Sequence, residues 1–104
     1  MFIDDERLPV RPRDWKIVRS MFEFTQIVRI HGMPHYISFD HDLADQFTGY
    51  DIAKLIVNLD LDDSQYRIPD GFDFYVHSEN PIGKKNIEGL LNNYLQFREE
   101  KLTL

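Results

Sequence analysis

The chain contains no cysteine, which excludes disulfide bonds and thiolate metal sites and fits a reducing compartment. It has no hydrophobic run long enough to span a membrane, and we expect no signal peptide. Basic residues are in the minority, with 12 Lys and Arg against 18 Asp and Glu, and the formal charge of −6 disfavours a broad nucleic-acid-binding face. These absences lead us to expect a cytoplasmic protein with no membrane partner.

Apolar residues are frequent enough to form one core. The 104 residues are 42% hydrophobic, which predicts a single domain over residues 1–104 and argues against disorder. Apolar runs predict strands at residues 1–4, 15–19, 35–40 and 72–77. Helical spacing predicts a helix capped by Ser20 and stopped at Gly32, another over residues 50–59 and a third from Asn80. This alternation predicts an α/β fold, with a mostly parallel sheet, helices on both faces and a loop between the first two strands.

Three of the predicted strands run directly into polar residues. The first is followed by Asp4-Asp5-Glu6-Arg7, the third by Asp40-His41-Asp42 and the fourth by His77-Ser78-Glu79-Asn80. In an open α/β sheet, ligands bind in the crevice outside the carboxyl ends of the strands. The sequence therefore predicts one pocket that gathers these side chains.

Four motifs are spread along the chain: a DDxR-like start at residues 4–7, ISFDHDL at 37–43, TGYD at 48–51 and HSxNPxG at 77–83. With them the chain resembles the receiver domains of response regulators, and more closely the cyclic-phosphate-processing receiver domains. The resemblance implies a receiver-like (flavodoxin-like) three-layer sandwich with strand order 2-1-3-4 and the fifth strand missing. It also implies action on cyclic phosphates, such as the 2′,3′-cyclic ends of RNA.

Two departures from ordinary receivers disfavour a phosphorelay switch. Asp40 stands at the position of the phospho-accepting aspartate, but no fifth strand follows to deliver the receiver lysine. His77 replaces the hydroxyl residue of the fourth strand.

The acidic residues after the strands predict a divalent cation. Asp4, Asp5, Asp40 and Asp42 are expected to lie close together, where unpaired carboxylates raise one another's pKa. Mg²⁺ or Mn²⁺ would relieve this repulsion, because hard cations prefer oxygen ligands. Alternatively, Arg7 and Arg19, which follow the first two strands, neutralise the charge of these carboxylates.

Two histidines follow the third and fourth strands. Hydrolysis of a cyclic phosphodiester needs a base to activate water and an acid to protonate the leaving ribose oxygen, and imidazole can do either. We expect His77 and His41 to exchange protons, with Asp40 and the hydroxyl of Ser78 beside them. The alternative for His41 is a structural role, held by Asp42.

A bound phosphate would need positive charge and N–H donors. The guanidinium groups of Arg7 and Arg19 match phosphate oxygens, although they match carboxylates equally well. The helix that begins near Asn80 offers backbone N–H groups, with Gly83 permitting close approach and Lys84 adding charge.

Other residues receive structural roles. Gly49 is assigned to a turn that requires φ > 0. Residues 60–63 are expected to form a solvated helix end, and residues 98–101 a charged surface tail. Trp15 is expected in the core in preference to a base-stacking platform, and His31 and His35 on the surface.

The leading hypothesis is a phosphoesterase that processes a cyclic phosphate, with a small phosphorylated ligand or an RNA 3′ end as its partner. The alternative is a receiver-like module that binds a nucleotide or phosphate without turnover. A phospho-accepting switch at Asp40 and an interaction protein that retains the acidic cluster are further hypotheses.

Overall fold

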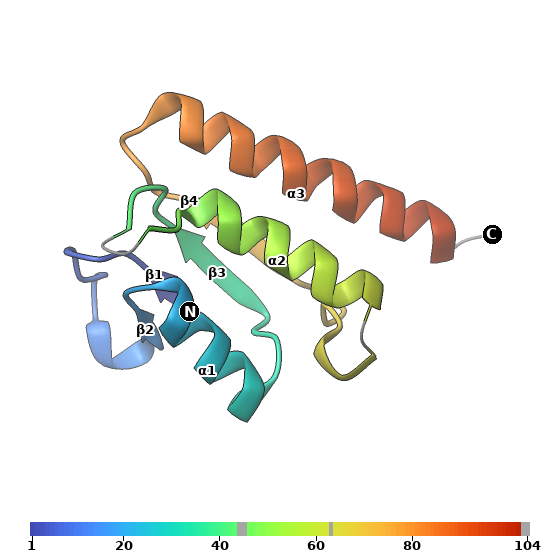
Figure 1. Cartoon of the computed structure of the whole chain (residues 1–104), viewed down its shortest axis with the longest axis horizontal. Helices are drawn as coiled ribbons and strands as arrows, with labels where there is room; N and C mark the ends of the chain where they lie inside the picture. The colour runs from blue at the N-terminus through green and yellow to red at the C-terminus, as the bar shows by residue number, and fades with distance from the viewer. Residues whose placement is uncertain (44–45, 63, 103–104) are drawn as a thin grey trace.

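The computed structural model describes residues 1–43, 46–62 and 64–102 (Figure 1). In chain order its elements are β1 (Phe2–Ile3), the 3₁₀ turn η1 (Pro12–Asp14), β2 (Ile17–Val18), α1 (Met21–His31), β3 (Tyr36–Phe39), α2 (Gly49–Asp62), the 3₁₀ turn η2 (Ser64–Tyr66), β4 (Asp73–Val76) and α3 (Pro81–Leu102). Every predicted strand and helix is present, with shorter strands and a longer α2. The connection between β1 and β2 holds only η1, as its length predicted.

The four strands are parallel and lie in the order β2-β1-β3-β4. The backbone pairing continues just past the strand ends, because the N–H groups of Asp4, Asp40 and His77 donate to carbonyls of the neighbouring strands. The side chains of these three residues therefore continue the alternation between the two faces of the sheet that the strands before them show. The predicted sheet order and receiver-like α/β fold are confirmed.

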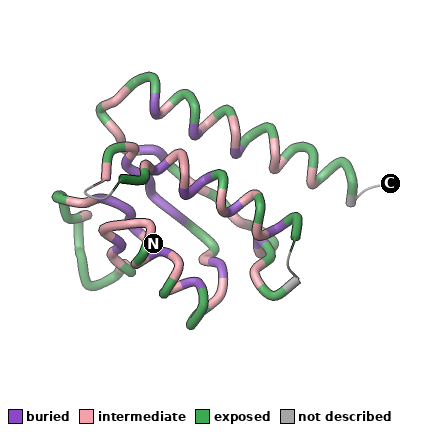
Figure 2. The backbone as a smooth tube through the Cα atoms, in the orientation of Figure 1, coloured by how far each residue is buried: buried purple, intermediate pink, exposed green. Residues whose placement is uncertain are grey.

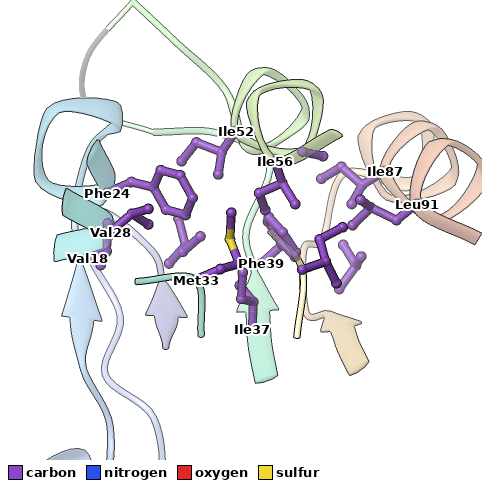
Figure 3. Close-up of a cluster of buried hydrophobic side chains, with 14 residues drawn as sticks. Val18, Phe24, Val28, Met33, Ile37, Phe39, Ile52, Ile56, Ile87 and Leu91 are labelled. Atoms are coloured by element: carbon purple, nitrogen blue, oxygen red, sulfur yellow. The ribbon is translucent and has the colours of Figure 1, made fainter. Parts of the chain in front are cut away.

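All three helices pack on the same face of the sheet. Figure 3 shows α1, α2 and α3 along one side of the strands, with Phe24, Ile56 and Leu91 directed between them and the sheet. The expectation of helices on both faces is therefore wrong for the described residues, which form two layers instead of three.

The handedness of crossover connections explains this arrangement. The steps from β2 to β3 and from β3 to β4 cross the sheet in the same direction, so right-handed crossovers place α1 and α2 on one face. The step from β1 to β2 runs the opposite way and would place a helix on the other face. That connection contains only η1, so the second face has no helix.

The core lies between the sheet and the helices. Buried residues run along β3 and the inward sides of the helices (Figure 2). The fully buried side chains include Ile3, Val18, Phe24, Ile37, Phe39, Ile52, Ile56, Ile87 and Leu91. Each such side chain contributes about 1.5–3 kcal/mol of hydrophobic stabilisation. The loops at the carboxyl ends of the strands are therefore anchored in a rigid base.

Local signals in the sequence set the ends of α1. The hydroxyl of Ser20 accepts a hydrogen bond from the N–H of Glu23 at 3.2 Å, and the helix stops at Gly32, whose φ is 80°. Gly49 differs from its prediction, because the described glycines with positive φ are Gly32 and Gly71. A Cβ at Gly49 would lie 2.0 Å from the carbonyl oxygen of Asp40, so close approach of two backbones requires this glycine.

Asp60 is buried, which corrects the prediction of a solvated helix end. Asp60 is 5% exposed, and its carboxylate accepts hydrogen bonds from the N–H of Ile68, the hydroxyl of Tyr94 and Nε of Arg98. Asp63, part of the same prediction, lies outside the described residues. Arg98 is likewise an internal partner and not part of a surface tail.

Within the described part of the chain, no helix combines the length and apolar character needed to cross a membrane.

The exposed positions predicted for His31 and His35 are confirmed.

Candidate active site

A pocket of about 330 Å³ opens at the carboxyl ends of β1, β3 and β4. In Figure 1 this is the end of the sheet where α2 and α3 begin. The lining residues are Asp4, Asp5, Glu6, Arg7, Asp40, Asp42, Ser78, Glu79 and Asn80. The structure thus brings together the three polar segments that the sequence predicted to meet.

The lining of this pocket is strongly acidic. Six of its residues are Asp or Glu and one is basic, Arg7. Two of the acids, Glu6 and Glu79, received no role from the sequence. Because like charges repel, a phosphate would enter this pocket only with additional positive charge.

Asp4 is the most deeply held of the acids. Its Oδ1 accepts from the N–H groups of Glu6 and Arg7, and its Oδ2 accepts from Arg7 Nε and His77 Nε2, all at 2.9–3.0 Å. Burial by itself would raise the pKa of Asp4, but the two backbone hydrogen bonds, the His77 bond and the Arg7 charge outweigh it and lower that pKa. Asp4 is therefore an ionised carboxylate at neutral pH.

His77 is fixed at both ring nitrogens. Its Nε2 lies 3.0 Å from Asp4 Oδ2, and its Nδ1 lies 2.7 Å from the hydroxyl of Ser38. An ionised carboxylate only accepts, so Nε2 carries a proton, and in the neutral ring Nδ1 accepts from the hydroxyl of Ser38. The ring also stacks on Phe2, with centroids 4.5 Å apart and planes at 3°. His77 is thereby built into the wall below the pocket.

His41 lies beside two residues that line the pocket. Its Nδ1 is 3.0 Å from Asp42 Oδ1 and 3.4 Å from Asn80 Nδ2. Because the carboxylate of Asp42 accepts, Nδ1 carries the proton and the lone pair is left on Nε2. Of the residues that the structure describes, none is hydrogen-bonded to Nε2. Unlike the ring of His77, the ring of His41 therefore has one nitrogen without a hydrogen-bond partner among the described residues.

The sequence missed Ser38 and Phe2 as supports of His77. The alternation of side chains along a strand could have identified Ser38, because this polar residue within an apolar strand points to the same side of the sheet as Asp40.

The profile of the family described as "Cyclic-phosphate processing Receiver domain" matches residues 1–93. The chain belongs to this family. No curated protein and no solved structure matches the chain. The whole pocket and both histidines of this receiver domain lie within the matched residues.

Three predicted phosphate ligands of this receiver domain have other partners. Arg19 Nη1 donates to the carbonyls of Asp4 and Arg7, at 2.8 Å each, and so ties down the loop after β1. The N–H of Gly83 donates to Asn80 Oδ1, which caps α3. The ammonium of Lys84 lies over the ring of Tyr75, 5.8 Å from its centroid. None of these three lines the pocket, whereas Arg7 and Asn80 do.

Asp4, Asp5 and Asp40 each place a carboxylate oxygen within 4.8 Å of the others. The four donors around Asp4 already occupy its oxygens. Asp40 accepts from the N–H of His41 at 2.8 Å, and Arg7 Nη2 lies 3.6 Å from the same oxygen. Asp5 and Asp40 are therefore the carboxylates with room for a further positive partner, and Asp42 lines the pocket near them.

Proposed function

We propose that this receiver domain hydrolyses a cyclic phosphodiester, such as the 2′,3′-cyclic phosphate of an RNA end or a nucleotide, to a phosphomonoester. The observation that carries the proposal is the imidazole of His41, whose Nδ1 is held by Asp42, a residue of the pocket lining. Membership of the family supports cyclic phosphates as the class of substrate.

The reaction adds one water across a P–O bond. The water oxygen bonds to phosphorus, the bond from phosphorus to one ribose oxygen breaks, and that oxygen takes a proton. A single imidazole serves both proton transfers, since Nε2 of His41 accepts the proton of the water and then returns it to the ribose oxygen. Asp42 holds the ring in this tautomer and stabilises the imidazolium formed in between.

His77 acts as a positioning residue in this scheme. Both of its nitrogens are engaged within the protein, so it orients Asp4, and Asp4 in turn orients Arg7. The guanidinium of Arg7 lies over Asp4 and Asp40, where it faces the incoming phosphate. The sequence assigned proton transfer to both histidines, and the hydrogen bonds favour His41 for that step.

The acidity of the pocket supports a cation requirement. We propose that Asp5 and Asp40 hold Mg²⁺ or Mn²⁺, an arrangement of two carboxylates plus waters and phosphate that suits these ions. When bound, the ion supplies positive charge to the phosphate oxygens. Arg7 then adds the only positive side chain of the pocket lining.

The test is incubation of the full chain with a short RNA that ends in a 2′,3′-cyclic phosphate, with Mg²⁺, with Mn²⁺ and with EDTA. Products are resolved by mass. We expect the RNA to gain one water, with loss of this activity in His41→Gln. His35→Gln is the matched control, because His35 is exposed and precedes β3, at the opposite end of that strand from Asp40 and His41.

Several outcomes decide between the alternatives. An active His41→Gln variant would remove His41 as the proton-transfer group. Full activity in EDTA together with an active Asp5→Asn variant would reject the cation. An RNA that binds and is recovered unchanged would support the non-catalytic binding module instead.

A further inference from the structure

The second face of the sheet carries an aromatic surface. We call it the helix-free face and define it by Phe2, Trp15, Tyr36, Ser38 and Tyr75. On β3, Ile37 and Phe39 point into the core, so Tyr36 and Ser38 point the other way, as Tyr75 does beside the buried Val76 on β4. The core residues that pack between the sheet and helices α1, α2 and α3 lie on the opposite face (Figure 3).

The aromatic rings of this face contact one another. Trp15 lies 6.0 Å from Tyr36 and 5.7 Å from Phe2, and Phe2 stacks on His77. Trp15 is therefore half-buried on the helix-free face and not in the core, where the sequence placed it. Tyr36 remains 41% exposed and Tyr75 55% exposed. Flat aromatic faces of this kind, next to solvent, are suited to stack on nucleobases.

The helix-free face runs directly into the pocket. Alternate residues of a strand share a side, so Ser38 leads to Asp40 on β3, and Tyr75 leads to His77 on β4. At about 3.3 Å per residue, Tyr75 lies roughly 7 Å from His77 along β4. A chain whose end lies in the pocket would therefore continue over this face.

Exposed cationic side chains border this face although the chain is acidic. The segment from Leu8 to Val18, which carries Trp15 onto the face, holds the exposed Arg11, Arg13 and Lys16, whereas Asp14 and Asp73, the register partner of Tyr36, add negative charge. On the other side, the ammonium of Lys84 lies over the Tyr75 ring. Positive side chains that border exposed rings complement the phosphates and bases of a single strand.

We propose that the helix-free face binds the nucleotides that precede the cyclic phosphate of a single-stranded RNA, by stacking bases on Tyr75 and Tyr36. This rests on the proposed function, since the phosphate in the pocket fixes where the strand ends. It assigns the domain an RNA end in preference to a free cyclic nucleotide. The small size of the face limits it to a few nucleotides, which is compatible with the overall charge of −6.

The test compares two probes that need no turnover: adenosine 3′-monophosphate and a tetra-adenylate that ends in a 3′-phosphate. Trp15 is the only tryptophan, so its fluorescence reports on this face directly. We expect the tetra-adenylate to quench Trp15 and to bind at least tenfold more tightly than the mononucleotide. Tyr75→Ala should weaken binding of the tetra-adenylate about tenfold and leave binding of the mononucleotide unchanged, since only the longer probe loses a base stack.

Phe22→Ala is the matched control, because Phe22 is a 69% exposed aromatic residue on α1. Equal affinities for the two probes, or no effect of Tyr75→Ala, would overturn the proposal. Sedimentation that shows a dimer for the wild type and a monomer for Tyr75→Ala would also overturn it, because a second copy of the chain would then occupy the face. Hydrolysis of 2′,3′-cyclic AMP and of a cyclic-ended tetra-adenylate separates this proposal from the previous one. Equal hydrolysis of the two substrates would reject RNA binding by the helix-free face but not the phosphoesterase. Tight RNA binding without hydrolysis would reject the phosphoesterase but not RNA binding by this face.

Discussion

The α-carbon of Gly83 lies directly against the imidazole of His41. A Cβ at Gly83 would lie 2.3 Å from Cγ and 2.5 Å from Cδ2 of that ring, closer than carbon atoms can approach without displacement. Gly83 is held there by its own N–H, which donates to the Asn80 side chain at 3.0 Å. The first turn of α3 thus forms a wall that sets the position of the His41 ring.

Gly83→Ala should uncouple activity from stability. The new methyl group must push the His41 ring away, and a displacement of about 1 Å at a reacting group can reduce the rate about 100-fold. Turnover of a 2′,3′-cyclic substrate and thermal unfolding would be measured side by side. Gly89→Ala is the control on the same helix, because a Cβ there meets nothing within 4 Å. That control should gain about 0.5–1 kcal/mol of stability and keep its activity. Wild-type turnover in Gly83→Ala would show that the wall does not matter.

The position of the site could be predicted because its residues are local to the strands. Asp4, Asp40 and His77 each follow an apolar run directly, so parallel strand order was enough to bring them to one pocket. The partners inside that pocket could not be predicted in the same way. Whether Arg7 faces a carboxylate or a ligand depends on distances that spacing along the chain does not specify.

Other features depended on contacts between distant residues. Asp60 and Arg98 are 38 positions apart, and nothing in their local sequences marks either as buried. Gly49 is a glycine because the backbone of Asp40 approaches it, although a turn glycine would look the same in sequence. The helix-free face exists because crossovers are right-handed and the short connection between β1 and β2 contains no α-helix. The alternation of strands and helices along the sequence does not by itself show which face each helix covers.

Ser38 should fix the tautomer of His77. In the wild-type protein, nitrogen-15 spectra of the neutral ring are expected to show the proton on Nε2 and none on Nδ1, because Asp4 accepts and Ser38 donates. Ser38→Ala leaves Nδ1 without this donor and should lower the free energy of unfolding by about 1–3 kcal/mol. A protonated Nδ1 in the wild-type protein would contradict the assigned tautomer.

Asp60 should make the fold sensitive to acid. Burial by itself would raise the pKa of Asp60, but hydrogen bonds from Tyr94 and Ile68 and the pairing with Arg98 outweigh it and lower that pKa. A lowered pKa means that the stabilisation is present above the unfolded value near 4 and is lost as pH falls through the folded value. The free energy of unfolding should therefore fall as pH decreases below about 5.

Substitution of Asp60 separates its part of this acid sensitivity from that of other acids. Asp60→Asn leaves the largely buried Arg98 without its charge partner and should cost about 3–5 kcal/mol at neutral pH. Its unfolding free energy should then depend less on pH between about 5 and 3 than that of the wild type. Asp62→Asn, at an exposed position of α2, is the control and should keep the wild-type pH dependence. An unchanged slope in Asp60→Asn would assign the acid sensitivity elsewhere.

Tyr94 gives the same network an alkaline limit. Burial and the hydrogen bond to Asp60 raise the pKa of Tyr94 to about 12. Because the folded value lies above the unfolded value near 10, the stabilisation is present below pH 10 and is lost as pH rises through the folded value. Tyr94→Phe removes a hydrogen bond to a charged acceptor and should cost about 1.5–3 kcal/mol at neutral pH. The stability difference between wild type and Tyr94→Phe should shrink as pH rises from 10 toward 12, measured by denaturant unfolding at each pH. A difference that stays constant over this range would show that the Tyr94 hydroxyl does not stabilise the fold through its proton.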